Sequence, residues 1–134
     1  MKPIVLITRR VDPAVVELLT SVCHVLPRLG SSSHPLQHIR LLAGCANALL
    51  MTTPEYVDEL LLKNCPRLRV IACAFRIAEH IDIAACTRRG IWVTNVLRQD
   101  HGTGAELEAA RNVLDVFGGD MPRGAVNEIL LPAA

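Results

Sequence analysis

RLRVIACAFRIAEHIDIAACTRRGIWVTNV, at residues 67–96, is the stretch that decides the fold. It contains two runs, Leu68 to Ala74 and Ile91 to Val96, that are apolar on both faces. Strands of this kind are typical of a parallel sheet that helices cover on both sides. The segment between the runs, residues 81–86, predicts a short helix that ends near Gly90. The stretch therefore predicts a β-α-β unit with a ligand site in the loop after its first strand.

The chain before this stretch repeats the alternation of strands and helices. Short apolar runs predict three more strands, and amphipathic runs led by proline or an acid predict helices between them. The expected strands lie at residues 4–8, 24–29 and 46–51, and the expected helices lie at residues 12–23, 35–42 and 54–64. The pattern predicts an α/β fold of flavodoxin-like type, with a five-stranded parallel sheet flanked by helices, in one domain at residues 1–134.

The end of the chain is organised differently from this βα core at residues 1–97. Residues 98–104 are polar and end in Gly102-Thr103-Gly104, which predicts a connector. Residues 105–117 form an amphipathic pattern that Gly118-Gly119 ends, so we expect a C-terminal helix there. The following residues predict a semi-extended tail, and together the helix and tail occupy residues 105–134.

The composition excludes several classes of function. The 134 residues are 51% hydrophobic and 3% aromatic with a formal net charge of +1, which favours neither nucleic-acid binding nor disorder. No apolar run reaches the length of a membrane span and the N-terminus lacks a signal peptide, so we expect a cytoplasmic protein. The five cysteines have no metal-binding spacing, which predicts buried thiols. His34 and His38 lie one helical turn apart without an evident third ligand, so we expect no metal.

The deciding stretch also carries a family resemblance. Three sequence segments resemble the D-isomer-specific 2-hydroxyacid dehydrogenases, namely PRLRVIACA, HIDIAACTRRG and IWVTN. Within that family, Cys73-Ala74-Phe75-Arg76 and Trp92 are closest in wording to phosphite (phosphonate) dehydrogenase. The resemblance implies the substrate-binding domain of an NAD-dependent oxidoreductase.

The tail resembles the same family. ARNVLDVF and PRGAVNEILL, within residues 110–131, are similar to its C-terminus, and the resemblance implies a nucleotide-binding domain between residue 97 and the last helix. That domain is missing, so we expect an engineered or excised domain deletion with residues 98–104 as the splice. The family's cofactor and catalytic residues belong to the missing part, which predicts that the chain is not an enzyme on its own. Alternatives are one half of a split dehydrogenase that needs a nucleotide-binding partner, or an inert α/β scaffold.

The loop after the strand at Leu68 to Ala74 is the main candidate site. The resemblance implies that it contacts the anionic group of the substrate, with Arg76 in place of a lysine. The guanidinium of Arg76 and the N–H groups of Ile77 and Ala78 could then hold a small oxyanion. Ile77 stands where the family has glycine, and a β-branched residue does not take a glycine-only conformation. A solvated loop without a ligand is therefore the alternative.

Other polar residues follow the expected strands at the same edge. Thr53 could line the cleft, or it could cap the next helix through its hydroxyl. Arg9-Arg10 could make the edge basic together with Arg76, which excludes a receiver domain and disfavours a flavin site. Gly102-Thr103-Gly104 is no dinucleotide fingerprint because Leu107 replaces its third glycine, so no cofactor is expected.

The missing domain also bears on self-association. Its removal predicts an exposed apolar surface that includes Ile77, Ala78 and Leu97. The sequence therefore predicts a monomer or a weak homodimer, with exchange of the C-terminal helix between two chains as one route to a dimer.

Overall fold

The protein is built around a five-stranded parallel sheet with the strand order β2-β1-β3-β4-β5. The computed structural model describes residues 2–26, 44–76, 80–97 and 102–129. Its strands are β1 (Ile4–Ile7), β2 (His24–Leu26), β3 (Ala48–Met51), β4 (Val70–Cys73) and β5 (Trp92–Thr94). All four strand pairs are parallel, which confirms the predicted α/β fold. The order reverses between β1 and β3, as in flavodoxin-like sheets.

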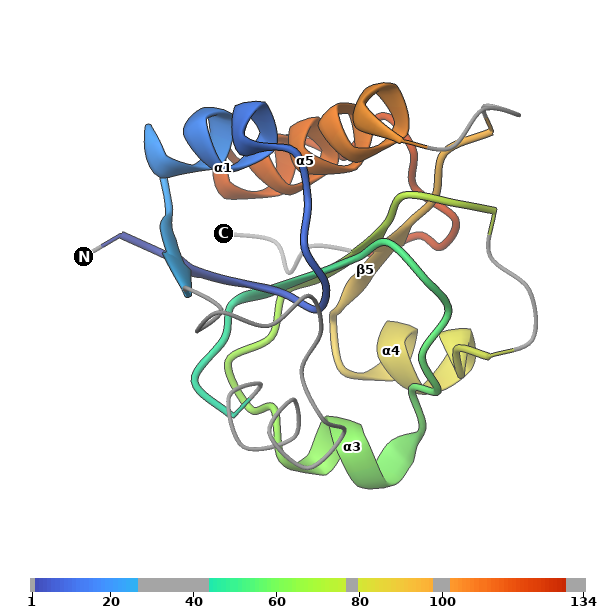
Figure 1. Cartoon of the computed structure of the whole chain (residues 1–134). Coiled ribbons are helices and arrows are strands. Elements are labelled where there is room, and N and C mark those ends of the chain that lie inside the picture. Colours follow the sequence, from blue (N-terminus) through green and yellow to red (C-terminus); the bar gives the residue numbers. More distant parts are fainter. Residues whose placement is uncertain (1, 27–43, 77–79, 98–101, 130–134) are drawn as a thin grey trace.

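Helices cover both faces of the sheet (Figure 1). Helices α1 (Pro13–Thr20) and α5 (Thr103–Phe117) lie together on one face, and α3 (Glu59–Lys63) and α4 (Ile83–Arg88) lie on the other. The strands alternate their buried side chains between two apolar clusters, one on each side. The helix expected at residues 35–42 falls outside the described residues. No described helix is both long enough and apolar enough to span a bilayer.

Aspartates start three of these helices. The carboxylates of Asp12, Asp58 and Asp82 accept hydrogen bonds from the backbone N–H groups of the first helical turns at 2.9, 2.9 and 3.0 Å. The prediction of a helix at residues 54–64 was wrong at its start, because α3 begins only at Glu59. The peptide of Val57 instead pairs with the chain around Ile81 in an isolated parallel bridge, which keeps it out of the helix.

Glycines end the helices as predicted, but the start of α5 differs from the prediction. Gly90 follows α4 with a φ of 73°, a conformation that glycine adopts without strain. Gly119 follows α5 with a φ of 86°. Helix α5 starts at Thr103 rather than at residue 105, so Thr103 and Gly104 of the expected connector are helical.

The described part of the tail is held against the sheet. Ala125 forms an antiparallel bridge with Thr94 of β5. The Val126 N–H donates to the Val93 carbonyl at 2.8 Å, and the Asn95 N–H donates to the Gly124 carbonyl at 3.0 Å. The tail therefore covers the outer edge of β5.

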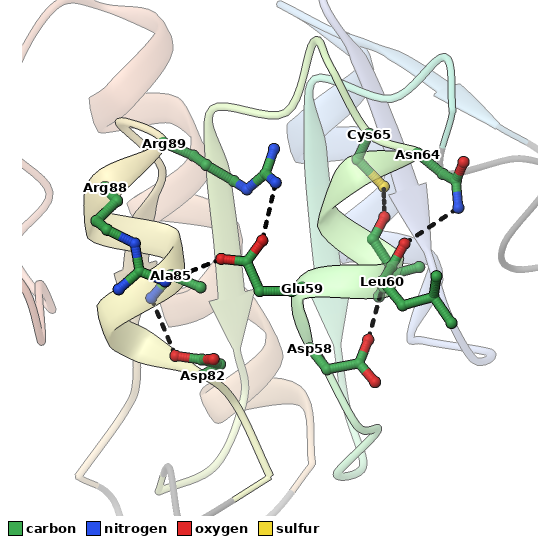
Figure 2. Close-up of polar contacts among 10 residues, drawn as sticks. Asp58, Glu59, Leu60, Asn64, Cys65, Asp82, Ala85, Arg88 and Arg89 are labelled. Atoms are coloured by element: carbon green, nitrogen blue, oxygen red, sulfur yellow. Dashed lines mark hydrogen bonds and ion pairs between the residues drawn. The ribbon is translucent and has the colours of Figure 1, made fainter.

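A charged cluster joins α3 to α4 on the face of the sheet opposite to α1 and α5 (Figure 2). The two carboxylate oxygens of Glu59 accept hydrogen bonds from Arg88 and Arg89, each at 2.9 Å. These bonds lower the pKa of Glu59, and the bond from Arg89 has the larger effect. Because all three side chains are substantially exposed, the cluster orients the two helices more than it stabilises them.

Candidate functional site

The carboxyl ends of the strands bring the predicted site residues to one edge. Thr53 follows β3 by two residues, Arg76 follows β4 by three, and the two strands pair with Met51 opposite Cys73. The Ala74 N–H donates to the Met51 carbonyl at 2.8 Å, so the pairing continues to the point where both chains turn away. Thr53 and Arg76, two of the predicted site residues, thus follow neighbouring strands at this edge. Ile77 and Ala78 lie outside the described residues.

Thr53 has an unmatched polar group. Its hydroxyl oxygen is buried and has no hydrogen-bond partner among the described residues. The alternative that Thr53 caps the next helix is wrong, because Asp58 caps α3. A buried hydroxyl without a partner costs free energy, so this position suits a bound polar group or an ordered water.

His80 is a second unmatched polar group, and it was not among the site residues predicted from the sequence. Its side chain is buried, with 9% of the residue exposed, and its Nε2 has no described partner. The ring lies 5.3 Å from that of Phe75, and the main-chain carbonyl accepts a hydrogen bond from Val57 at 2.8 Å. Burial lowers the pKa of His80, so the ring is neutral at pH 7. No local sequence signal marks this burial, because the contacts come from Phe75, after β4, and from Val57, before α3.

Arg76 is the cation best placed to meet an anion at this edge. It is exposed and has no acidic partner among the described residues. Arg9, which was expected to add charge here, lies 3.6 Å from the carboxylate of Glu55. The edge therefore combines an available guanidinium with two neutral polar groups, Thr53 and His80. Such a set can hold and orient a small oxyanion.

The start of α5 does not fit a dinucleotide. Thr103 donates a hydrogen bond from its hydroxyl to the Asp12 carboxylate at 3.2 Å. A carboxylate oxygen of Glu106 accepts a hydrogen bond from the Asp12 N–H at 3.1 Å. Two carboxylates at the positive end of the helix would repel a pyrophosphate.

Cysteine and metal chemistry find little support in the described residues. Burial raises the pKa of Cys23 to about 11 and those of Cys73 and Cys86 to about 12, so these thiols are protonated at pH 7. No group of three metal-ligating side chains occurs in the described ranges. His34 and His38 lie outside these ranges.

Comparison with known proteins identifies the family. Residues 5–127 match the profile described as D-isomer specific 2-hydroxyacid dehydrogenase, catalytic domain. A glyoxylate reductase of Pyrococcus furiosus is 30% identical over 120 residues, covering 85% of this chain and 36% of the relative. A glyoxylate reductase of Aeropyrum pernix is 34% identical over 94 residues, covering 70% of this chain and 28% of the relative. The crystal structure of the PH0520 protein from Pyrococcus horikoshii superposes with a TM-score of 0.63 at 25% identity, covering 72% of this chain and 28% of that one.

These findings correct one expectation and limit another. The prediction that the chain is no enzyme was wrong, because the matching family and the relatives named glyoxylate reductases are enzymes. The relatives share the predicted dehydrogenase family, but their names do not include phosphite dehydrogenase. The chain spans about a third of the length of the relatives that it matches. It belongs to the D-isomer-specific 2-hydroxyacid dehydrogenase family, of which it contains the catalytic, substrate-binding domain.

Proposed function

We propose that this domain binds a small 2-oxo acid such as glyoxylate at the carboxyl edge of its sheet, as the substrate half of a reductase. The observation that carries the proposal is the presence, at the same edge of the sheet, of two buried, unmatched polar groups on Thr53 and His80 and of the exposed guanidinium of Arg76. A carboxylate would accept hydrogen bonds from Arg76, and the neutral groups could meet the oxo oxygen. The names of the relatives support glyoxylate as the first substrate to test.

Phosphite is a second candidate substrate. It is favoured by one observation, the arginine at position 76 in a segment whose wording resembles phosphite dehydrogenase. A guanidinium can bind a phosphorus oxyanion with two parallel hydrogen bonds. Both substrates would use the same group, but they would react in opposite directions: reduction of glyoxylate consumes NADH, whereas oxidation of phosphite to phosphate produces it.

The nicotinamide cofactor of such a reaction would be held by another domain, because the start of α5 does not suit a pyrophosphate. We propose that residues 98–104 mark a domain deletion and that a nucleotide-binding domain completes the enzyme. The order of elements supports this proposal, since α5 is the next described element after β5.

The test uses the full chain alone, and the chain with the nucleotide-binding domain of a glyoxylate reductase, added separately or inserted in place of residues 98–102. Oxidation of NADH or NADPH is followed with glyoxylate, and reduction of NAD⁺ or NADP⁺ is followed with phosphite. We expect the added domain to raise the rate at least about tenfold, and Arg76→Gln to raise KM about 10- to 100-fold with a smaller change in kcat. Arg111→Gln, which removes an exposed charge from α5, is the matched control. An equal KM for the Arg76 variant and the unaltered chain would contradict the proposal.

A further inference from the structure

A second cationic site lies at the amino edge of the sheet, away from the carboxyl edge described above. A cavity of about 310 Å³ opens there, where β1 and β4 begin and α5 ends. Its lining includes Lys2, Arg67 and Arg69, together with Asn47 and the ring of Phe117. Cavities of about this size and larger are where proteins bind small ligands.

The three cations converge without acidic partners. Among the residues that the structure describes, no acidic side chain lines the cavity, and none forms an ion pair with Lys2, Arg67 or Arg69. Three like charges around one cavity repel each other, and an anion between them relieves that repulsion. The surface therefore favours a ligand with more than one negative charge.

The ends of two helices explain part of this arrangement. Lys2 donates to the Thr20 carbonyl at the end of α1, and Arg69 donates to the Val116 carbonyl at the end of α5, both at the long distance of 3.4 Å. Cations commonly complement the negative ends of helices in this way. Each contact uses one N–H donor, whereas the ammonium of Lys2 has three donors and the guanidinium of Arg69 has five. Neither contact involves Arg67. Donors thus remain for a ligand.

The backbone below the cations is rigid. The Asn47 side chain accepts a hydrogen bond from the Ile4 N–H at 2.7 Å and donates one to the Arg67 carbonyl at 3.3 Å. The Arg69 N–H donates to the Asn47 carbonyl at 2.8 Å. Asn47 therefore fixes the spacing of the two arginines, and a fixed spacing lowers the entropy that is lost on binding.

Phe117 gives the cavity an apolar wall. The guanidinium carbon of Arg69 lies 5.5 Å from the centre of its ring, which orients the guanidinium by a cation–π contact. An oriented guanidinium offers two parallel N–H groups, a geometry that matches phosphate oxygens. We propose that this cavity binds a small phosphate-bearing anion through Arg67 and Arg69, with Lys2 at its rim.

The experiment measures binding of pyrophosphate to the full chain by isothermal titration calorimetry at low salt. Inorganic phosphate serves as a second probe with a single phosphorus oxyanion. We expect saturable binding of pyrophosphate and weaker binding of phosphate. The double variant Arg67→Gln/Arg69→Gln should weaken pyrophosphate binding at least about tenfold, because each lost arginine removes charge-assisted hydrogen bonds. Arg111→Gln removes an exposed charge from α5 outside the cavity and should change Kd less than about twofold.

Two further comparisons make the result specific. The variants Arg67→Gln and Arg69→Gln should keep the melting temperature close to that of the unaltered chain, since both arginines are exposed. Arg76→Gln reports on the carboxyl edge. The proposal is overturned if pyrophosphate does not saturate, if Arg111→Gln weakens binding as much as the double variant does, or if Arg76→Gln alone abolishes it.

Discussion

Replacing Gly124 by alanine should detach the tail from the sheet. A Cβ at this position would lie 2.5 Å from the Asn95 carbonyl oxygen and 2.7 Å from Nδ2 of Asn112, closer than such atoms approach. The Asn95 oxygen is backbone and cannot move aside alone. The Gly124 N–H also donates to Oδ1 of Asn112 at 2.9 Å, so displacement of the tail breaks this bond as well.

The cost can be worked from these contacts. Overpacking of this kind costs about 1–3 kcal/mol. Each backbone hydrogen bond lost at the β5 edge adds about 0.5–1.5 kcal/mol, and the bond of Asn95 to Gly124 is the first to be lost. We therefore expect Gly124→Ala to lower the free energy of unfolding by roughly 2–4 kcal/mol, measured by urea denaturation with circular dichroism.

Gly90→Ala is the matched control. Gly90 has a positive φ of 73° but no atom within 4 Å of its Cβ position, so alanine there meets backbone strain without a clash. That strain costs about 1–2 kcal/mol. Hydrogen exchange adds a local measurement, because only Gly124→Ala should speed exchange at the Asn95 N–H. The reasoning is refuted if Gly124→Ala costs no more than Gly90→Ala and leaves the Asn95 amide protected.

Three further predictions follow from the described contacts. Burial lowers the pKa of His80 in the folded state, so the free energy of unfolding should fall as the pH drops below about 6.5 towards that lower pKa. In urea denaturation, His80→Gln should reduce this dependence on pH. Asp58→Ala should cost about 1 kcal/mol in the same assay, because the N–H of Leu61 loses its cap, while Lys63→Ala should cost less. Iodoacetamide at pH 7 should modify Cys45 before Cys73, because Cys45 is exposed and Cys73 is buried with a pKa of about 12. A peptide-mapping time course measures the two rates, and equal rates would contradict the burial of Cys73.

Local patterns predicted the sheet and the presence of α1, α3, α4 and α5, although several ends of these helices differ from the prediction. The strands β3 and β4 are fully buried, and uninterrupted apolar runs are the direct consequence of burial on both faces. Asp12 caps α1 within a few residues of itself, so the sequence contains the complete interaction, whereas Asp82 caps α4 although it was expected inside the helix at residues 81–86. Gly90 follows α4 for the same local reason.

The errors lie where a distant segment decides the local structure. Pro54 favours a helix start, but the bridge between Val57 and Ile81 delays α3 until Asp58. The burial of His80 likewise depends on Phe75, and no periodic pattern announces it. For the candidate site, the sequence therefore predicted Thr53 and Arg76 at one edge but could not predict which polar groups lack partners.

The covering of β5 by the tail has a consequence for synthesis on the ribosome. The tail follows β5 in chain order only after α5, so a nascent chain presents the outer edge of β5 before Ala125 is available to pair with Thr94. An uncovered strand edge is a template for pairing with other chains. Translational pausing between β5 and the tail would therefore lengthen the period in which neighbouring nascent chains can aggregate.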